Sequence, residues 1–138
     1  MIRTSHSEED TAAVGREMAQ NLAADAVVLL SGDLGAGKTA FVRGLAEGLG
    51  VDPGEVSSPT FTLIQEYRGG RLTLFHVDLY RLTPKEVDDL GLDDLTWGGG
   101  VVAVEWPDRW HRAPPDAVRV TLTASGDTER TIEIAAPL

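Results

Sequence analysis

One short stretch restricts what this chain can fold into more than any other feature of its sequence. Residues 32–39 read GDLGAGKT and match the pattern G-x-x-x-x-G-K-[ST] at every fixed position. Glycines at these positions let successive backbone N–H groups curl around a polyphosphate, and the loop opens a helix whose N-terminal dipole faces the anion. The pattern therefore predicts a phosphate-binding loop between a strand and a helix.

The segments on either side of this loop fit that prediction. Residues 26–30 form a short, continuously apolar run, which is typical of a parallel strand buried on both faces. Residues 39–49 carry apolar side chains at helical spacing, so a helix is expected to leave the loop. Lys38 is expected to reach the β- and γ-phosphates of a nucleotide, and the Thr39 hydroxyl to bind Mg²⁺. The residues expected to bind the nucleotide phosphates are Gly32, Asp33, Leu34, Gly35, Ala36, Gly37, Lys38, Thr39 and Ala40.

Helical and strand patterns alternate along the rest of the chain. Helices are expected over residues 8–23 and from residue 83 to about 91, strands over 61–67, 71–80 and 101–104, and two final strands over about 118–123 and 132–134. Buried parallel strands mixed with helices indicate an α/β fold. We predict a three-layer P-loop NTPase-like domain, in which a hairpin and a C-terminal ribbon add antiparallel strands to a mixed sheet. A length of 138 residues is that of one domain, so a single domain is expected over 1–138.

The charge of the chain limits its partners. Twelve Lys and Arg residues against 22 Asp and Glu residues give a formal net charge of −10, whereas gripping a nucleic-acid backbone normally takes a basic face. We therefore expect no direct binding to DNA, and an anion site that depends on a local device such as the phosphate loop. The absence of cysteine, the polar N-terminus and the lack of a membrane-length apolar run predict a cytoplasmic protein without a membrane segment.

Two acidic residues stand where expected strands end. Asp78 lies at the end of one expected strand, and Glu105 directly follows the apolar run 101–104. In a nucleotide site, one acid is expected to hold Mg²⁺ directly or through water, and the other to orient or activate the attacking water. The residues do not decide which acid touches the metal. The alternative is that each is a strand-end acid exposed to solvent.

Three further residues near these motifs have open interpretations. Thr60 either orders around the γ-phosphate, as in nucleotide switches, or is a turn residue that caps the next strand. Trp106 either stacks on the base or a partner, or belongs to the half-buried core. His76 is interpreted as a hydrogen-bonded strand histidine rather than a metal ligand, since the chain has no cysteine to complete a zinc site.

The kind of nucleotide and the class of protein follow from what else the sequence contains. Guanine recognition needs an N-K-x-D element, but the one asparagine, Asn21, has no lysine after it. ATP is therefore favoured over GTP. An ATP hydrolase is the leading interpretation. A small-molecule kinase would need an acceptor pocket and usually a mobile lid, for which 138 residues leave little chain. A nucleotide-gated binding module with negligible hydrolysis is the third interpretation.

Taken together, these motifs resemble the bacterial TsaE (YjeE) family, the P-loop ATPases of tRNA threonylcarbamoyladenosine biosynthesis. The segments that carry the resemblance span roughly residues 7–110 and occur in the family's order. They are GDLGAGKT at 32–39, VRG at 42–44, SPTFTL at 58–63, HVDLYRL at 76–82, LGLD at 90–93 and VEWP at 104–107.

This resemblance implies roles for the matching residues. It implies ATP and Mg²⁺ as ligands, with Lys38, Asp78 and Glu105 as catalytic residues. Metal binding is implied for Thr39, Glu105 and Asp78, with Glu105 nearer the metal and γ-phosphate and Asp78 acting through water. Further contacts to the nucleotide are implied for Thr60, Trp106, Ser7 and Glu8. The implied partners are tRNA threonylcarbamoyl-transferase complex proteins, with tRNA met only indirectly, and the ATPase is expected to be slow without them.

Overall fold

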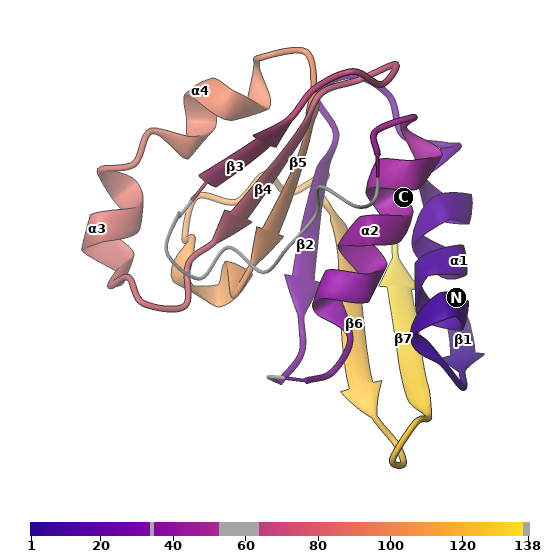
Figure 1. The fold of residues 1–138 in the computed structure, drawn as a ribbon. Helices are drawn as coiled ribbons and strands as arrows, with labels where there is room; N and C mark the ends of the chain where they lie inside the picture. The colour runs from indigo at the N-terminus through magenta and orange to yellow at the C-terminus, as the bar shows by residue number, and fades with distance from the viewer. Residues whose placement is uncertain (34, 53–63, 137–138) are drawn as a thin grey trace.

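A seven-stranded mixed sheet forms the centre of the computed structural model, which describes residues 1–33, 35–52 and 64–136 (Figure 1). The strand order across the sheet is β1-β7-β6-β2-β5-β4-β3. The strands are β1 (Ile2–Ser5), β2 (Val27–Ser31), β3 (Ile64–Tyr67), β4 (Leu74–Asp78), β5 (Val101–Glu105), β6 (Val118–Ala124) and β7 (Arg130–Ala135).

The central strands run parallel and the outer strands antiparallel. Strand β2 pairs in parallel with both β5 and β6, and β5 pairs in parallel with β4. Strand β3 joins β4 as an antiparallel hairpin, and β7 pairs antiparallel with β6 and β1. The predicted α/β fold, with a mixed sheet, a hairpin and a C-terminal ribbon, is confirmed. The ribbon is part of the main sheet, because β6 lies directly beside β2.

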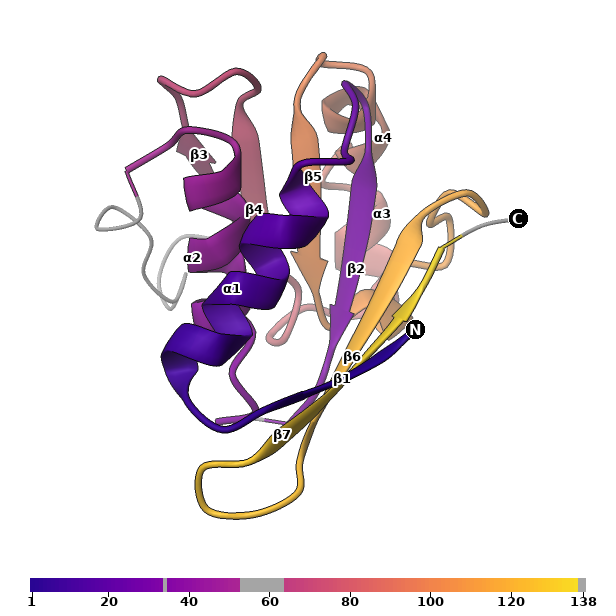
Figure 2. The ribbon, with the colours of Figure 1, turned by 90° about the vertical axis from the view of Figure 1, so that its right-hand side faces the viewer.

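Helices cover both faces of this sheet (Figure 2). On one face α1 and α2 pack against each other and against Val28 and Leu30 of β2, whereas Val27 and Leu29 face α3 and α4 on the other. This alternation follows from the period-2 geometry of a strand. None of the helices in the described ranges is both long and apolar enough to cross a membrane. The helices are α1 (Glu8–Ala19), α2 (Lys38–Gly48), α3 (Pro84–Asp88), α4 (Leu92–Thr96) and the 3-10 helix η2 (Pro107–Arg109).

The structure differs from the sequence-based expectation at β1, at the end of α1 and around α3, and β4 covers Leu74–Asp78 of the expected strand 71–80. Strand β1 was not expected, because its residues are mostly polar and only Ser5 is fully buried. Helix α1 ends at Ala19, before the expected end of the helix at residue 23. A capping box at Thr83 opens α3 where a helix was expected to begin, but Gly91 adopts a left-handed conformation (φ 72°) at the N-cap of a second short helix, α4. A glycine that marks a helix end can therefore also begin the next helix.

Glycines allow α1 and α2 to lie very close together. A Cβ added at Gly44 would stand 1.9 Å from the backbone oxygen of Ala12, and one at Gly15 would stand 2.4 Å from that of Phe41. Real Cβ atoms do not approach backbone this closely, so side chains at these positions would push the helices apart. Because α2 leaves the phosphate loop directly, its contact with α1 also fixes the position of that loop.

We therefore predict that Gly44→Ala destabilises the protein. The clash with Ala12 should lower the free energy of unfolding by about 1–3 kcal/mol, although alanine favours a helix over glycine by about 1 kcal/mol. The measurement is urea unfolding. Gly126→Ala is the matched control, because its Cβ would meet nothing nearer than Glu129 Cβ at 3.5 Å. Equal stability of the two variants would show that the helix contact is not constrained as described.

Candidate functional site

The predicted site residues meet at one edge of the sheet because three parallel strands end there in register. Leu30 of β2 is paired with Glu105 of β5, and Glu105 is paired with Asp78 of β4. The phosphate loop leaves β2 just beyond Leu30, so the loop and both acids converge, as ligand sites commonly do at the carboxyl ends of parallel strands. A cavity of about 300 Å³ opens between them. It is lined by Glu8, Gly35, Gly37, Lys38, Thr39, Ala40, Arg43, Asp78, Tyr80, Glu105 and Trp106.

The backbone of the phosphate loop has a positive φ at three described positions, all of them glycine: Gly32, Gly35 and Gly37. Gly37, the N-cap of α2, has φ 100°, in the left-handed region that side chains disfavour. At Gly32, φ is 154° and a Cβ would stand 2.7 Å from the carbonyl oxygen of Leu122 on β6. The loop is therefore shaped both by its own backbone and by the neighbouring strand. Leu34, also predicted to contact phosphate, lies outside the described residues.

Lys38, the first residue of α2, has a buried side chain whose ammonium group is held by three groups. Its Nζ donates a hydrogen bond to the Gly32 carbonyl oxygen at 2.6 Å and lies 3.8 Å from Glu105 Oε1. It also lies 4.2 Å from the centre of the Trp106 ring, within cation–π distance. These contacts offset the cost of burying the charge. They also keep the ammonium group beside the phosphate loop, where it is predicted to bind the phosphates of a nucleotide.

Glu105 is more enclosed than the sequence indicated. It is the last residue of β5 rather than the residue after it, and its side chain is only 8% exposed. His76 Nε2 lies 2.6 Å from Glu105 Oε2, while Oε1 faces Lys38. His76 is thus a hydrogen-bonded strand histidine, as predicted. The interpretation of Glu105 as a solvent-exposed strand-end acid is wrong.

The side chain of Asp78 is half-buried, whereas that of Glu105 is buried. Its Oδ1 accepts a hydrogen bond from the backbone N–H of Tyr80 at 2.9 Å. Burial raises the pKa of the Asp78 carboxyl above its ordinary value of 3.8, and the nearby charge of Glu105 raises it further. The Tyr80 hydrogen bond, Lys38 and His76 lower this pKa in part. The result is a carboxylate at the cavity wall that accepts a proton more readily than an ordinary aspartate.

Trp106 forms the wall of the cavity next to Lys38. Its backbone has φ 59°, a conformation rare for a bulky residue, and its ring centre lies 4.9 Å from that of Tyr80. The ring also packs against the core on the α3 and α4 face. Trp106 is therefore part of the half-buried core, as one interpretation had it, and its ring also lies next to Lys38, the predicted phosphate-binding lysine. Thr60, the other residue with two interpretations, lies outside the described residues.

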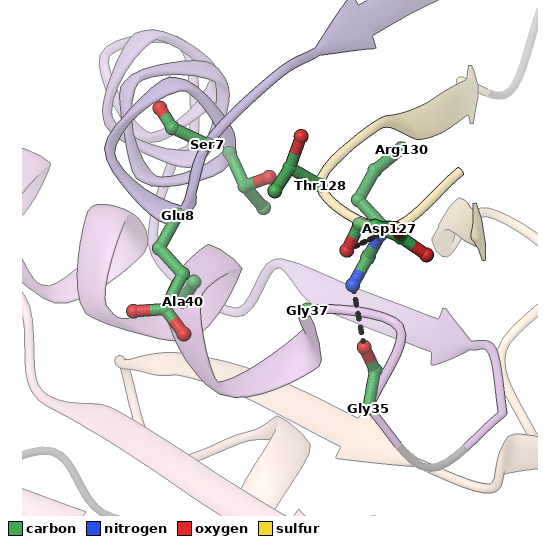
Figure 3. A pocket seen from close by; sticks show the side chains of 9 residues that line it. Ser7, Glu8, Gly35, Gly37, Ala40, Asp127, Thr128 and Arg130 are labelled. Atoms are coloured by element: carbon green, nitrogen blue, oxygen red, sulfur yellow. Dashed lines mark hydrogen bonds between the residues drawn. The ribbon is translucent and has the colours of Figure 1, made fainter. Parts of the chain in front are cut away.

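A second cavity of about 230 Å³, whose lining is drawn in Figure 3, shares Glu8, Gly35, Gly37 and Ala40 with the first. Ser7 and Glu8, which the family resemblance implicates in nucleotide binding, line it. Residues of the turn between β6 and β7 also line it, and Arg130 donates a hydrogen bond from Nη2 to the Gly35 carbonyl oxygen at 3.2 Å. The full lining is Ser7, Glu8, Thr11, Gly35, Gly37, Ala40, Asp127, Thr128 and Arg130.

Sequence reasoning missed the contribution of the C-terminal ribbon to this second cavity. Asp127, Thr128 and Arg130 belong to no motif, and Arg130 is 95 positions away from Gly35. Only the pairing of β6 with β2 brings the turn to the loop. No local pattern signals this contact. Ser125-Gly126-Asp127 marks a turn in the sequence but not its neighbour.

The donor atoms at the first cavity suit Mg²⁺ better than a softer metal. The Thr39 hydroxyl and the carboxylates of Asp78 and Glu105 line the same cavity. Mg²⁺ prefers oxygen ligands and commonly uses one or two protein carboxylates together with substrate phosphates and water. Within the described ranges, no cluster of three or more histidine or acidic side chains is arranged to hold a metal without such help. The residues present fit a metal that arrives with a nucleotide.

The family model and the relatives found by comparison with known proteins all carry the same family name. The chain matches the family model described as "Threonylcarbamoyl adenosine biosynthesis protein TsaE" over residues 5–132. It is 45% identical over 132 residues to the tRNA threonylcarbamoyladenosine biosynthesis protein TsaE of Nostoc sp., covering 92% of this chain and 80% of that protein. The protein of the same name from Treponema pallidum is 44% identical over 133 residues, covering 95% of this chain and 97% of the relative. The crystal structure of YdiB from Bacillus subtilis is similar with a TM-score of 0.81 and 36% identity, covering 99% of this chain and 84% of that one.

The raised pKa of Asp78 predicts a pH-dependent gain in stability on Asp78→Asn. Well below pH 3.8 the carboxyl is protonated in both the folded and unfolded chain and makes no difference. Above its raised folded-state pKa it is charged in both, and its burial then lowers the free energy of unfolding. Asp78→Asn should therefore raise the urea midpoint at pH 7, and the gain should shrink as the pH falls toward 3.8.

Asp88→Asn, on the exposed side of α3, is the matched control and removes the same charge from solvent. It should show a smaller change at pH 7. A loss of stability in Asp78→Asn at pH 7 would contradict the sign of the shift.

Proposed function

The chain belongs to the TsaE family, and we propose that it binds and hydrolyses ATP with Mg²⁺ as the ATPase subunit of tRNA threonylcarbamoyladenosine biosynthesis. The observation that carries this proposal is the convergence of the phosphate loop, Lys38, Glu105 and Asp78 on one cavity. Family membership supports the place in tRNA modification. The site supports the chemistry.

The two adjoining cavities suit the two ends of a nucleotide. They share Glu8, Gly35, Gly37 and Ala40, so a triphosphate along the loop would pass from one cavity to the other. We place the phosphates beside Lys38 and the adenosine beside Ser7 and the β6–β7 turn. The wall formed by Trp106 and Tyr80 would then lie on the γ-phosphate side. The lack of a guanine-recognition element in the sequence favours ATP.

Binding would change the partners of Lys38. In the structure its ammonium group is held by the Gly32 carbonyl oxygen, and phosphate oxygens offer a stronger, charged acceptor. Exchange of one for the other would move positive charge onto the β- and γ-phosphates, where charge develops during phosphoryl transfer. Thr39 and a carboxylate would hold Mg²⁺, whose positive charge would stabilise the negative charge of the phosphates.

The two acids have environments suited to different tasks. Glu105 is held between His76 and Lys38, which fixes it next to the place proposed for the γ-phosphate and metal. Asp78 has a raised pKa and a single described backbone partner, Tyr80 N–H, at the cavity wall. A carboxylate of this kind suits the acceptance of a proton from an attacking water. We assign metal and phosphate contact to Glu105 and water positioning to Asp78.

The net charge shapes the proposed role in tRNA modification. With a charge of −10, the chain is not suited to hold tRNA by itself. We infer that it meets tRNA indirectly, through transferase complex proteins that carry the basic surface, and that these partners stimulate a slow ATPase. We also infer that it acts in the cytoplasm, where ATP and tRNA are both found.

Lys38→Ala should abolish or greatly weaken nucleotide binding. Loss of a charge-assisted contact costs about 1.5–3 kcal/mol, so we expect at least a tenfold weaker affinity for Mg-ATP, measured by calorimetry. Lys85→Ala is the matched control, because Lys85 is the other lysine of the chain and lies exposed on α3. Wild-type affinity in Lys38→Ala would contradict the phosphate site.

Glu105→Gln should bind Mg-ATP and lose hydrolysis, by about 10²–10³-fold when measured with partner proteins present. Glu133→Gln, at an exposed position of β7, should hydrolyse ATP as the wild type does. Full activity of Glu105→Gln would remove Glu105 from catalysis. Transfer of the γ-phosphate to a small hydroxyl compound faster than hydrolysis would favour a kinase. A wild-type protein without hydrolysis in the presence of its partners would favour a binding module.

A further inference from the structure

His76 is a fully buried polar side chain with an incomplete set of hydrogen bonds. It lies in β4 with no exposed surface, and its Nε2 is 2.6 Å from Glu105 Oε2. Its other ring nitrogen, Nδ1, has no hydrogen-bond partner among the described residues. Burying a polar atom without a partner costs free energy. The contact with Glu105 is therefore the one described interaction that offsets the burial of the imidazole.

The sheet register explains how the two side chains meet. His76 is paired with Ala103, and Glu105 is paired with Asp78, two residues further along both strands. His76 and Glu105 are therefore diagonal neighbours on the same face, since residues two apart in a strand point the same way. The short side chain of Ala103 leaves room on that face. A long side chain can span the diagonal of neighbouring strands.

The chemistry of the contact fixes the direction of the hydrogen bond. An ionised carboxylate only accepts hydrogen bonds, so Nε2 must carry the hydrogen and donate it to Oε2. The second oxygen, Oε1, is the one that faces Lys38, at 3.8 Å from its Nζ. With a donor on one oxygen and a cation on the other, the carboxylate has little freedom to rotate. Oε2 is bonded to His76 in the protein interior, and Oε1 faces Lys38 at the cavity.

A purely structural role does not require a histidine at this position. Leu74, on the same face of β4, belongs to the core cluster with Val101 and Ala103. A leucine in place of His76 would fill similar space next to these residues and leave no unpartnered nitrogen. The property that the imidazole adds is the hydrogen-bond donor to Glu105.

We propose that His76 is a positioning residue, which holds the Glu105 carboxylate through Nε2–H···Oε2 so that Oε1 faces the γ-phosphate site. This assignment rests on the proposed ATPase function. His76 does not touch substrate or metal itself and acts only through Glu105. Removal of such an orienting partner typically lowers activity by about 10- to 100-fold.

Two substitutions of His76 distinguish the effect of its hydrogen-bond donor from the effect of its side-chain volume. His76→Leu removes the donor, whereas His76→Gln keeps an N–H at a place similar to Nε2. With partner proteins present, His76→Leu should lower kcat of ATP hydrolysis about 10- to 100-fold, with KM and Mg-ATP affinity changed less than threefold. His76→Gln should recover at least a third of wild-type kcat. Equal kcat in two folded variants, or a loss that falls on affinity instead, would overturn the proposal.

A spectroscopic measurement tests the contact without any ATP turnover. In the nucleotide-free protein with ¹⁵N-labelled histidine, His76 should show a slowly exchanging Nε2–H signal. Glu105→Ala should abolish this slow exchange. His6 and His111 are exposed and serve as internal controls that should not change. A ring hydrogen on Nδ1 alone, or an Nε2–H signal indifferent to Glu105→Ala, would overturn the proposal even if His76→Leu fails to fold.

The two measurements also separate this proposal from the proposed function. A wild-type protein that hydrolyses no ATP with its partners present would contradict the ATPase function and with it the catalytic purpose of His76. The histidine spectrum would still decide whether His76 holds Glu105. Normal hydrolysis in His76→Leu would contradict the positioning role and leave the ATPase function intact.

Discussion

The geometry of the candidate site depends on three parallel strands that end at the same edge of the sheet. Because β2, β5 and β4 are paired in one register, the phosphate loop, Glu105 and Asp78 leave the sheet at the same edge. A one-residue slip in a strand turns its side chains to the opposite face. Such a slip in β5 would move Glu105 away from both Lys38 and His76. The apolar side chains of these strands, buried on both faces of the sheet, are what fixes the register.

The protein combines a strongly acidic composition with a proposed anion site that is local. One of its two lysines, Lys38, is buried at the point proposed for the phosphates, and Glu105 and Trp106 surround its charge. Much of the remaining positive potential at the loop comes from backbone N–H groups and the start of α2. Such a site does not need a basic surface. An acidic protein can therefore bind a polyphosphate while its surface stays unsuited to nucleic acid.

The sequence predicted the features that local patterns encode and missed those that depend on tertiary pairing. The phosphate loop and the acids at 78 and 105 were recognisable, because their chemistry requires fixed residue types after apolar strands. Strand β1 was not, because its hydrogen bonds to β7 rather than its own side chains hold it in the sheet. Arg130 was missed for a similar reason, since its contact with Gly35 exists only because β6 lies beside β2. The burial of Glu105 was missed as well, because it depends on His76 and Lys38, which belong to other elements of the fold.

The most direct test is a structure of the protein with Mg²⁺ and a non-hydrolysable ATP analogue. We predict the triphosphate on the loop at residues 32–39, with Lys38 Nζ moved from the Gly32 carbonyl oxygen to the β- and γ-phosphates and Glu105 still bonded to His76. The adenosine should lie beside Ser7 and the β6–β7 turn. A nucleotide bound away from this loop, or Lys38 still bonded to Gly32 with the phosphates elsewhere, would contradict the site.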